Sequence, residues 1–117
     1  MKLNEMATTL GLEDLTPEIQ GGGDAEVTGG YASDLLSDVL AHAPHGGVLV
    51  TVQVHLSVVA VALHTGLSAV VFAMGRAPED AVRKKAIEEG VRLYVSKETA
   101  FDIAGRLYAA GLRGRGE

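Results

Sequence analysis

The sequence predicts a single α/β domain with a mainly parallel sheet of four or five strands and helices on both faces. Strand-like and helix-like segments alternate along the chain, as they do in folds with a parallel sheet. The strand-like segments are short apolar runs of the kind that such sheets bury on both sides. At 117 residues and 47% hydrophobic composition, the chain is long enough for one buried core. We expect residues 1–112 to form this domain and residues 113–117 to fray.

The first part of the chain predicts a helix, an edge strand and a connector. Apolar residues recur at helical spacing within the first ten positions, and Gly11 follows them as glycine follows many helix C-termini. Residues 12–16 are a candidate edge strand. Residues 17–24 contain three consecutive glycines and indicate a flexible connector. A short strand over residues 25–31 is expected to follow.

Three helix–strand units and a final helix complete the chain. Ser33 or Asp34 is placed to cap the first of these helices, because a side-chain oxygen there accepts from free backbone N–H groups. The strands are expected over residues 48–54, 67–74 and 91–95, which are rich in β-branched residues. The helices fill the intervening segments and the stretch before the last glycines.

Charge and cysteine content exclude several functional classes. The net charge of −5 argues against nucleic-acid binding, which relies on Lys and Arg at phosphates. The chain has no cysteine, which excludes thiol catalysis, disulfides and Cys-ligated zinc and is typical of a reducing compartment. The first residues lack the apolar core of a signal peptide. We therefore expect a cytoplasmic protein without a nucleic-acid partner.

One long segment raises the question of a membrane span. Residues 39–75 contain no Asp, Glu, Lys or Arg, which is length enough to cross a bilayer. Pro44, His55 and several glycines interrupt the segment, and no Trp or Tyr flanks it. A buried strand–helix–strand unit explains it better, so no membrane partner is expected.

Polar residues gather where the predicted strands end. Ligands of open parallel sheets bind beyond the carboxyl ends of the strands, so we expect one ligand site there. The predicted ligand-binding residues follow the first two strands of the parallel sheet: Thr28, Gly29, Gly30, Tyr31, Ser33, Asp34, Gln53 and His55. Further candidates follow the later strands: Gly75, Arg76, Ser96, Lys97 and Thr99.

Each of these residues also has a structural interpretation. Gly29 and Gly30 would let backbone N–H groups approach a ligand, or would form a tight turn that needs positive φ. Asp34 suits a helix cap better than an acid or base. His55 would contact a ligand or hydrogen-bond a neighbouring loop.

Motifs for catalysis are absent from the sequence. There is no Gly-x-x-x-x-Gly-Lys-Ser/Thr loop, no Gly-x-Gly-x-x-Gly and no Gly-x-Ser-x-Gly. His42 and His45, three residues apart, fit a solvated loop better than a metal site. We expect no catalytic residue, no metal and no cofactor, and the missing P-loop argues against a serine kinase.

The motif over residues 26–30, with residues 31–39 and 51–55, resembles a DRTGG domain. The similarity extends over nearly the whole chain. Thr28, Gly29 and Gly30 match the motif, whereas Glu26 and Val27 replace its Asp and Arg. The chain resembles the stand-alone form of the domain. DRTGG domains also accompany phosphotransacetylases and CBS-containing pyrophosphatases, and they are similar to the N-terminal domain of HPr kinase/phosphorylase.

The resemblance implies an α/β regulatory or dimerisation module for a nucleotide-like or anionic ligand. Our first hypothesis is accordingly a homodimeric regulatory module that binds such a ligand at the strand ends. A second is a protein-interaction adaptor, with a partner protein and no small ligand. A third is a small enzyme that uses His55 and Asp34 as acid–base partners.

Overall fold

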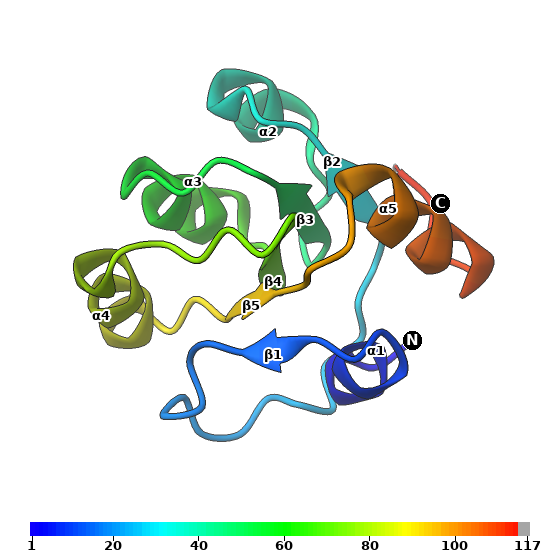
Figure 1. Cartoon of the computed structure of the whole chain (residues 1–117), viewed down its shortest axis with the longest axis horizontal. Helices are drawn as coiled ribbons and strands as arrows, with labels where there is room; N and C mark the ends of the chain where they lie inside the picture. The colour runs from blue at the N-terminus through cyan, green and yellow to red at the C-terminus, as the bar shows by residue number, and fades with distance from the viewer. Residues whose placement is uncertain (115–117) are drawn as a thin grey trace.

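The computed structural model describes residues 1–114, which form one five-stranded sheet with helices on both faces (Figure 1). The strand order is β1-β5-β4-β3-β2, in which β1 is antiparallel to β5 and the other pairs are parallel. The fold class predicted from the sequence is confirmed. Along the chain the elements are α1 (Leu3–Thr9), β1 (Glu13–Asp14), β2 (Gly30–Ala32), α2 (Leu36–His42), β3 (Val48–Thr51), α3 (Ser57–Thr65), β4 (Ala69–Phe72), α4 (Asp80–Glu89), β5 (Leu93–Val95) and α5 (Ala100–Ala109).

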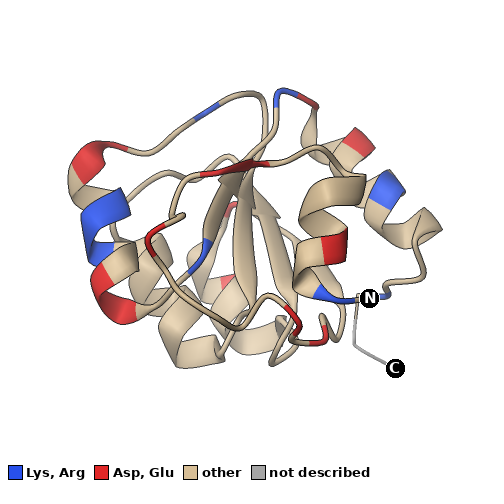
Figure 2. Ribbon diagram, turned by 90° about the horizontal axis from the view of Figure 1, so that it is seen from below, with Lys and Arg blue, Asp and Glu red and all other residues tan. Residues whose placement is uncertain are grey.

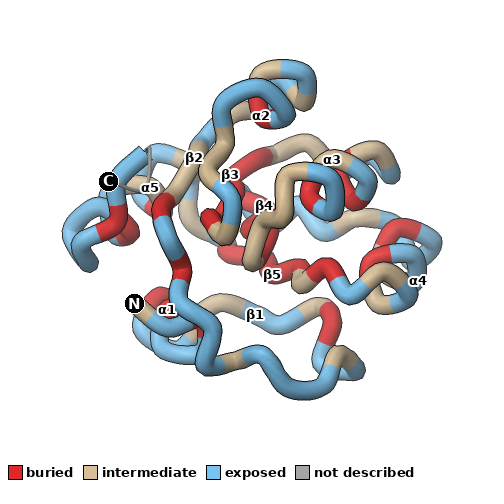
Figure 3. The backbone as a smooth tube through the Cα atoms, turned by 180° about the vertical axis from the view of Figure 1, so that it is seen from behind, coloured by how far each residue is buried: buried red, intermediate tan, exposed pale blue. Residues whose placement is uncertain are grey.

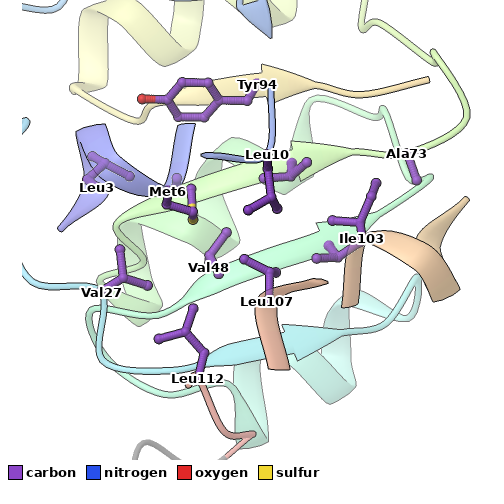
Figure 4. Packing of buried hydrophobic residues seen from close by; sticks show 13 residues of the cluster. Leu3, Met6, Leu10, Val27, Val48, Ala73, Tyr94, Ile103, Leu107 and Leu112 are labelled. Atoms are coloured by element: carbon purple, nitrogen blue, oxygen red, sulfur yellow. The ribbon is translucent and has the colours of Figure 1, made fainter. Parts of the chain in front are cut away.

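Alternating strand residues separate the core into two layers. Leu49, Val70 and Phe72 face α2, α3 and α4, whereas Val48 and Val71 face α1 and α5. Both sets are buried, so the strands are apolar on both faces (Figure 3). Figure 4 shows the second layer, in which side chains from α1 and α5 converge on the sheet. The three crossovers that join β2 to β5 therefore all lie on one face.

The strand expected over residues 25–31 is wrong in position. Residues 25–27 pair instead with the N-terminus, where Val27 N–H donates to the Met1 carbonyl and Leu3 N–H donates to the Ala25 carbonyl (2.8 and 3.0 Å). The chain enters the sheet only at Gly30. The candidate edge strand is confirmed as the two-residue β1, within the predicted residues 12–16.

The cap expected at Ser33 or Asp34 is also wrong. Helix α2 begins at Leu36, and its first turn receives no side-chain cap. Ser33 Oγ accepts from Leu35 N–H in the loop before the helix (3.2 Å), and Asp34 bonds elsewhere.

The predicted tail falls partly outside the described residues, since these end at Gly114. Arg113 is held against the sheet, because its carbonyl accepts from Gly30 N–H (3.0 Å) and its guanidinium lies over the Tyr108 ring. None of the helices within residues 1–114 has the length and apolarity needed to cross a membrane.

Candidate functional site

The predicted site residues lie at two opposite edges of the sheet. Thr28 and Gly29 precede β2, so they lie at the edge where the parallel strands begin. Gly30 and Tyr31 belong to β2 itself. The remaining four follow the ends of β2 and β3, at what we call the carboxyl edge: Ser33, Asp34, Gln53 and His55. The expectation of one site that includes Thr28 and Gly29 is therefore wrong, because parallel strands place residues before and after them at opposite ends.

Thr28 and Gly29 hold the turn that precedes β3. Thr28 Oγ1 donates to the His45 carbonyl (2.6 Å), and Thr28 N–H donates to the Gly46 carbonyl (3.1 Å). Val48 N–H donates to the Gly29 carbonyl (2.9 Å). Thr28 and Gly29 therefore stabilise this turn at the amino edge of the sheet, the edge where the parallel strands begin.

The tight turn with positive φ expected at Gly29-Gly30 is absent. Neither residue has positive φ. A Cβ on Gly30 would lie 3.8 Å from Val48 Cγ1, which is ordinary contact. Tyr31 lies on the face of the sheet that α2, α3 and α4 cover. Its hydroxyl donates to Asp38 of α2 (2.8 Å) and lowers the pKa of that carboxyl.

Asp34 joins the ends of two neighbouring strands. Its Oδ1 accepts from the Thr51 hydroxyl (2.9 Å) and from Val52 N–H (2.8 Å). Thr51 is fully buried, so this carboxylate satisfies a polar group that water does not reach. The Thr51 hydroxyl in turn accepts from Gln53 N–H (3.0 Å).

His55 organises the loop that leads into α3. Gln53 Oε1 accepts from His55 N–H (3.1 Å), and His55 Nδ1 accepts from Ser57 N–H (3.1 Å). Because a backbone N–H can only donate, Nδ1 carries no proton in this arrangement. The Ser57 hydroxyl, 2.8 Å away, then donates to the same nitrogen.

This arrangement does not assemble the acid–base pair of the third hypothesis. Among the hydrogen bonds of residues 1–114, none joins His55 to Asp34. The Asp34 carboxylate bonds to Thr51 and Val52, whereas the His55 ring bonds to Ser57 within its own loop. His42 pairs with Asp38 (3.1 Å) rather than with His45. No group of three potential metal ligands occurs within the same residues.

A crevice lies further along the carboxyl edge, between β4 and β5. The chain leaves β4 for α4 on one face and leaves β5 for α5 on the other, as Figure 1 shows. Where neighbouring parallel strands send their connections to opposite faces, the loops diverge and open a ligand crevice. The cavity there measures about 390 Å³ and is lined by Leu10, Gly11, Glu13, Gly75, Ala77, Val95, Ser96, Lys97 and Glu98.

The two loops of the crevice are tied together at its base. Met74 N–H donates to the Glu98 carbonyl, and Gly75 N–H donates to the Ser96 carbonyl (both 2.8 Å). Met74 and Gly75 have φ of 62° and 68°, and Met74 is the one described residue other than glycine in this region of φ. Residues with a strained backbone cluster at ligand sites, so the positive φ of Met74 is consistent with a ligand site at this loop.

Among the described residues that line the crevice, one cation has no ion pair. Glu98 is paired with Arg106 of α5, which also donates to the Leu10 carbonyl (3.2 Å). Lys97 is exposed, and no ion pair within residues 1–114 involves it. An anion in the crevice would therefore meet an unpaired ammonium group.

The sequence placed Gly75, Ser96 and Lys97 at strand ends as further candidates but did not include them among the predicted ligand-binding residues. Nothing in the residue pattern shows that α5 crosses to the other face of the sheet. The predicted ligand site was centred instead on the Thr-Gly-Gly motif at residues 28–30.

Comparisons with known proteins agree with this fold. The chain is similar to the regulatory region of a Clostridium perfringens pyrophosphatase, solved as its CBS and DRTGG domains in complex with the activator diadenosine tetraphosphate. The TM-score is 0.67 at 14% sequence identity. The match covers 97% of this chain and 48% of that one, so the chain spans about half of that structure. This likeness supports a DRTGG-like fold. No protein-family model and no curated protein sequence matches the chain.

Proposed function

We propose that this chain is a non-catalytic regulatory module that binds a small anionic, nucleotide-like ligand in the crevice between β4 and β5. The observation that carries the proposal is the divergence of the two connections around an unpaired Lys97. A volume of about 390 Å³ suits a small ligand. The similar pyrophosphatase region binds a nucleotide activator, which supports the same ligand class here.

Ser33, Asp34, Gln53 and His55 remain predicted ligand contacts at the same edge. Gln53 and His55 are hydrogen-bonded within the loop before α3, whereas Asp34 Oδ1 accepts two hydrogen bonds from the end of β3. A ligand that extends from the crevice along the carboxyl edge would reach them after Lys97. We propose these four residues as the outer part of the ligand site, and Thr28 and Gly29 are not included in it.

Ligand binding by a matched pair of lysine variants tests the proposal. The purified chain is titrated with inorganic pyrophosphate, ATP, diadenosine tetraphosphate and uncharged adenosine, with thermal stabilisation and calorimetry as readouts. Lys97→Ala should weaken binding of the anions about tenfold or more, the size of one charge-assisted hydrogen bond. Lys84→Ala, on the exposed side of α4, is the control and should bind like the parent.

Two results would overturn the proposal. One is anion binding that survives Lys97→Ala unchanged, which would place the ligand elsewhere. The other is no binding of any anion by a folded chain, which would favour the adaptor hypothesis.

A further inference from the structure

The two edges of the sheet differ in how far they are protected against pairing with another chain. Strands β1 and β2 are the edge strands. Proteins commonly protect such strands with charged residues, prolines or bulges, because their free backbone groups can pair with another strand. Strand β1 consists of Glu13 and Asp14, and Figure 2 shows it in the colour of acidic residues. Strand β2, with the sequence Gly-Tyr-Ala, carries neither a charge nor a proline, so its edge is the one open to pairing.

The backbone of β2 turns two of its residues away from the sheet. The Gly29 carbonyl and the Ser33 N–H are both hydrogen-bonded to β3 (2.9 and 3.2 Å). Successive residues of a strand point to opposite sides, so the backbone groups of Gly30 and Ala32 face outward. Gly30 N–H donates to the Arg113 carbonyl (3.0 Å). Within residues 1–114, the Gly30 carbonyl and both backbone groups of the exposed Ala32 make no hydrogen bond, so they are available to an added strand.

A pocket opens between this edge and α5. Its volume is about 190 Å³, and its walls, which are mostly apolar, come from β2, from Ala104 and Tyr108 of α5 and from residues 112–114. Gly30 and Ala32 lie on the face of the sheet that α5 covers and have little or no side chain to fill this space. Pockets for small molecules measure roughly 300–1,000 Å³, so this one suits a side chain better than a free ligand.

The most exposed aromatic side chains of α5 border the same edge. Phe101 and Tyr108 are 86% and 60% exposed. They lie about two helical turns apart, so they share one side of α5 with Ala104, which lines the pocket. Two helical turns rise about 11 Å, a length that three or four residues of an extended chain also span. A short strand along β2 would therefore cover both rings.

The chemistry of this edge favours a partner segment with an acidic residue. The Arg113 guanidinium lies over the Tyr108 ring, 3.7 Å from its centroid, and no ion pair within residues 1–114 includes Arg113. A carboxylate on the added strand would form a charge-assisted hydrogen bond with this guanidinium. Two copies paired through β2 would present only Gly30 and Ala32 to the pocket, which would leave it empty.

We infer that the β2 edge and the adjoining side of α5 bind an extended segment of a partner protein, which adds to the sheet as a further strand. The segment places an apolar side chain in the pocket and an acidic residue near Arg113. In strand addition, backbone hydrogen bonds supply affinity and pockets for alternate side chains supply specificity. The inference does not depend on the ligand proposal, because the crevice and this pocket share no lining residue.

Selection from a displayed library of random peptides provides the probe for this surface. Peptides of about eight residues, longer than an ordinary strand, are selected on the immobilised full chain. Enriched peptides are synthesised with a fluorescent label and titrated by anisotropy. They should alternate apolar with polar residues and contain Asp or Glu. Failure to enrich any peptide above a surface without the chain would overturn the inference.

Methylation of the peptide backbone distinguishes strand addition from other modes of binding. In an added strand every second N–H faces β2, so N-methyl groups at one alternate set of positions should abolish binding. The same groups at the other set should change the dissociation constant by less than about threefold, since those N–H groups face away. A peptide that tolerates every N-methyl group, or that loses binding without this alternation, would overturn the inference.

Variants of the chain locate the peptide on this edge. Ala32→Pro removes an outward N–H at an edge position, where proline is tolerated, and should abolish binding with an unchanged circular dichroism spectrum. Tyr108→Ala and Arg113→Glu should each weaken binding about tenfold or more. Leu63→Ser is the control, since Leu63 is 50% exposed on α3 in the other layer, and it should bind like the parent.

Two results with these variants would overturn the inference. One is peptide binding that Tyr108→Ala and Arg113→Glu leave unchanged, which would place the peptide elsewhere. The other is a parent chain that forms a dimer which the selected peptides dissociate and Ala32→Pro abolishes, because a second copy would then occupy the edge. The N-methyl series uses the parent chain, so it decides the mode of binding even where Ala32→Pro fails to fold.

Discussion

At the scale of single residues, Gly47 and Gly30 differ in the space around them. A Cβ on Gly47 would lie 2.7 Å from Pro44 Cγ, 2.9 Å from the Pro44 carbonyl oxygen and 3.1 Å from the Gly29 carbonyl oxygen. Backbone atoms surround the position, so the clash cannot be relieved by rotating a side chain. We predict that Gly47→Ala lowers the free energy of unfolding by about 1–3 kcal/mol. Gly30→Ala, in β2, should change it by less than about 1 kcal/mol. Urea denaturation of both variants checks the contrast, and equal losses would contradict it.

His55 provides a second residue-scale test, because its role in the free protein is now specified. Its Nδ1 accepts from Ser57 N–H, a bond between residues two apart. We predict that His55→Ala lowers the free energy of unfolding by about 0.5–1.5 kcal/mol. His55→Asn should recover most of this loss, since an Asn oxygen accepts from the N–H two residues on. Thermal melts of the two variants measure the effect. If Asn is no better than Ala, the Nδ1 bond is not what the ring contributes.

At the scale of elements, the sequence predicts most helices and strands but places one strand wrongly. The apolar runs that form β3, β4 and β5 pair with one another as predicted, so the local sequence pattern is sufficient to predict these strands. The sequence predicts a strand over residues 25–31, yet the backbone of residues 25–27 pairs with Met1 and Leu3 before the chain enters the sheet. That pairing joins segments far apart in sequence, and local pattern does not contain it. Moving the strand start to Gly30 transfers Thr28 and Gly29 from the carboxyl edge to the amino edge.

The connector after β1 depends on one arginine of α4. Arg83 Nη1 donates to both Glu18 oxygens (3.0 and 2.8 Å) and to the Leu15 carbonyl (3.3 Å). The hydrogen bond from Arg83 lowers the pKa of Glu18 below its usual 4.5. A lowered pKa in the folded state means that this stabilisation is complete above pH 4.5 and is lost as pH falls through the folded value.

We therefore predict that Arg83→Gln lowers the melting temperature at neutral pH and speeds amide exchange in residues 15–22. The difference in melting temperature between parent and variant should narrow as pH falls below 4.5, because protonated Glu18 no longer pairs. Melting curves across this range measure the narrowing. Lys97→Gln is the control, because no ion pair within residues 1–114 involves Lys97. A difference in melting temperature between parent and Arg83→Gln that is constant with pH would contradict the assignment.

At the scale of the whole molecule, the candidate site follows from how the connections are arranged. The sequence indicates that ligands bind at the carboxyl ends of the strands, and the crevice lies at this carboxyl edge. It does not indicate which neighbouring strands send their connections to opposite faces, since α5 and α4 are both ordinary amphipathic helices. Lys97 lies in the connection that leads from β5 to α5 in the second layer. Its place in the crevice therefore depends on the three-dimensional path of this connection.

The same arrangement predicts that the protein does not transfer phosphoryl groups. Phosphoryl transfer requires groups that stabilise the charge developing on the transferred phosphoryl, such as a Gly-rich loop, a lysine and a bound Mg²⁺. The sequence has no P-loop, and the backbone N–H groups of Met74 and Gly75 at the base of the crevice are already hydrogen-bonded, so they form no cradle for a phosphate. Lys97 is the lysine that lines the crevice, and Glu13 lines it too. We expect phosphate release from ATP, and phosphorylation of serine in added protein, at the level of the buffer. Both are measured with radiolabelled ATP on protein taken through successive columns, with Lys97→Ala in parallel. Activity that co-purifies with the chain at constant specific value and disappears in Lys97→Ala would show that the crevice is an active site. Activity that separates from the chain comes from another protein, and activity that co-purifies but is equal in Lys97→Ala does not depend on the crevice lysine.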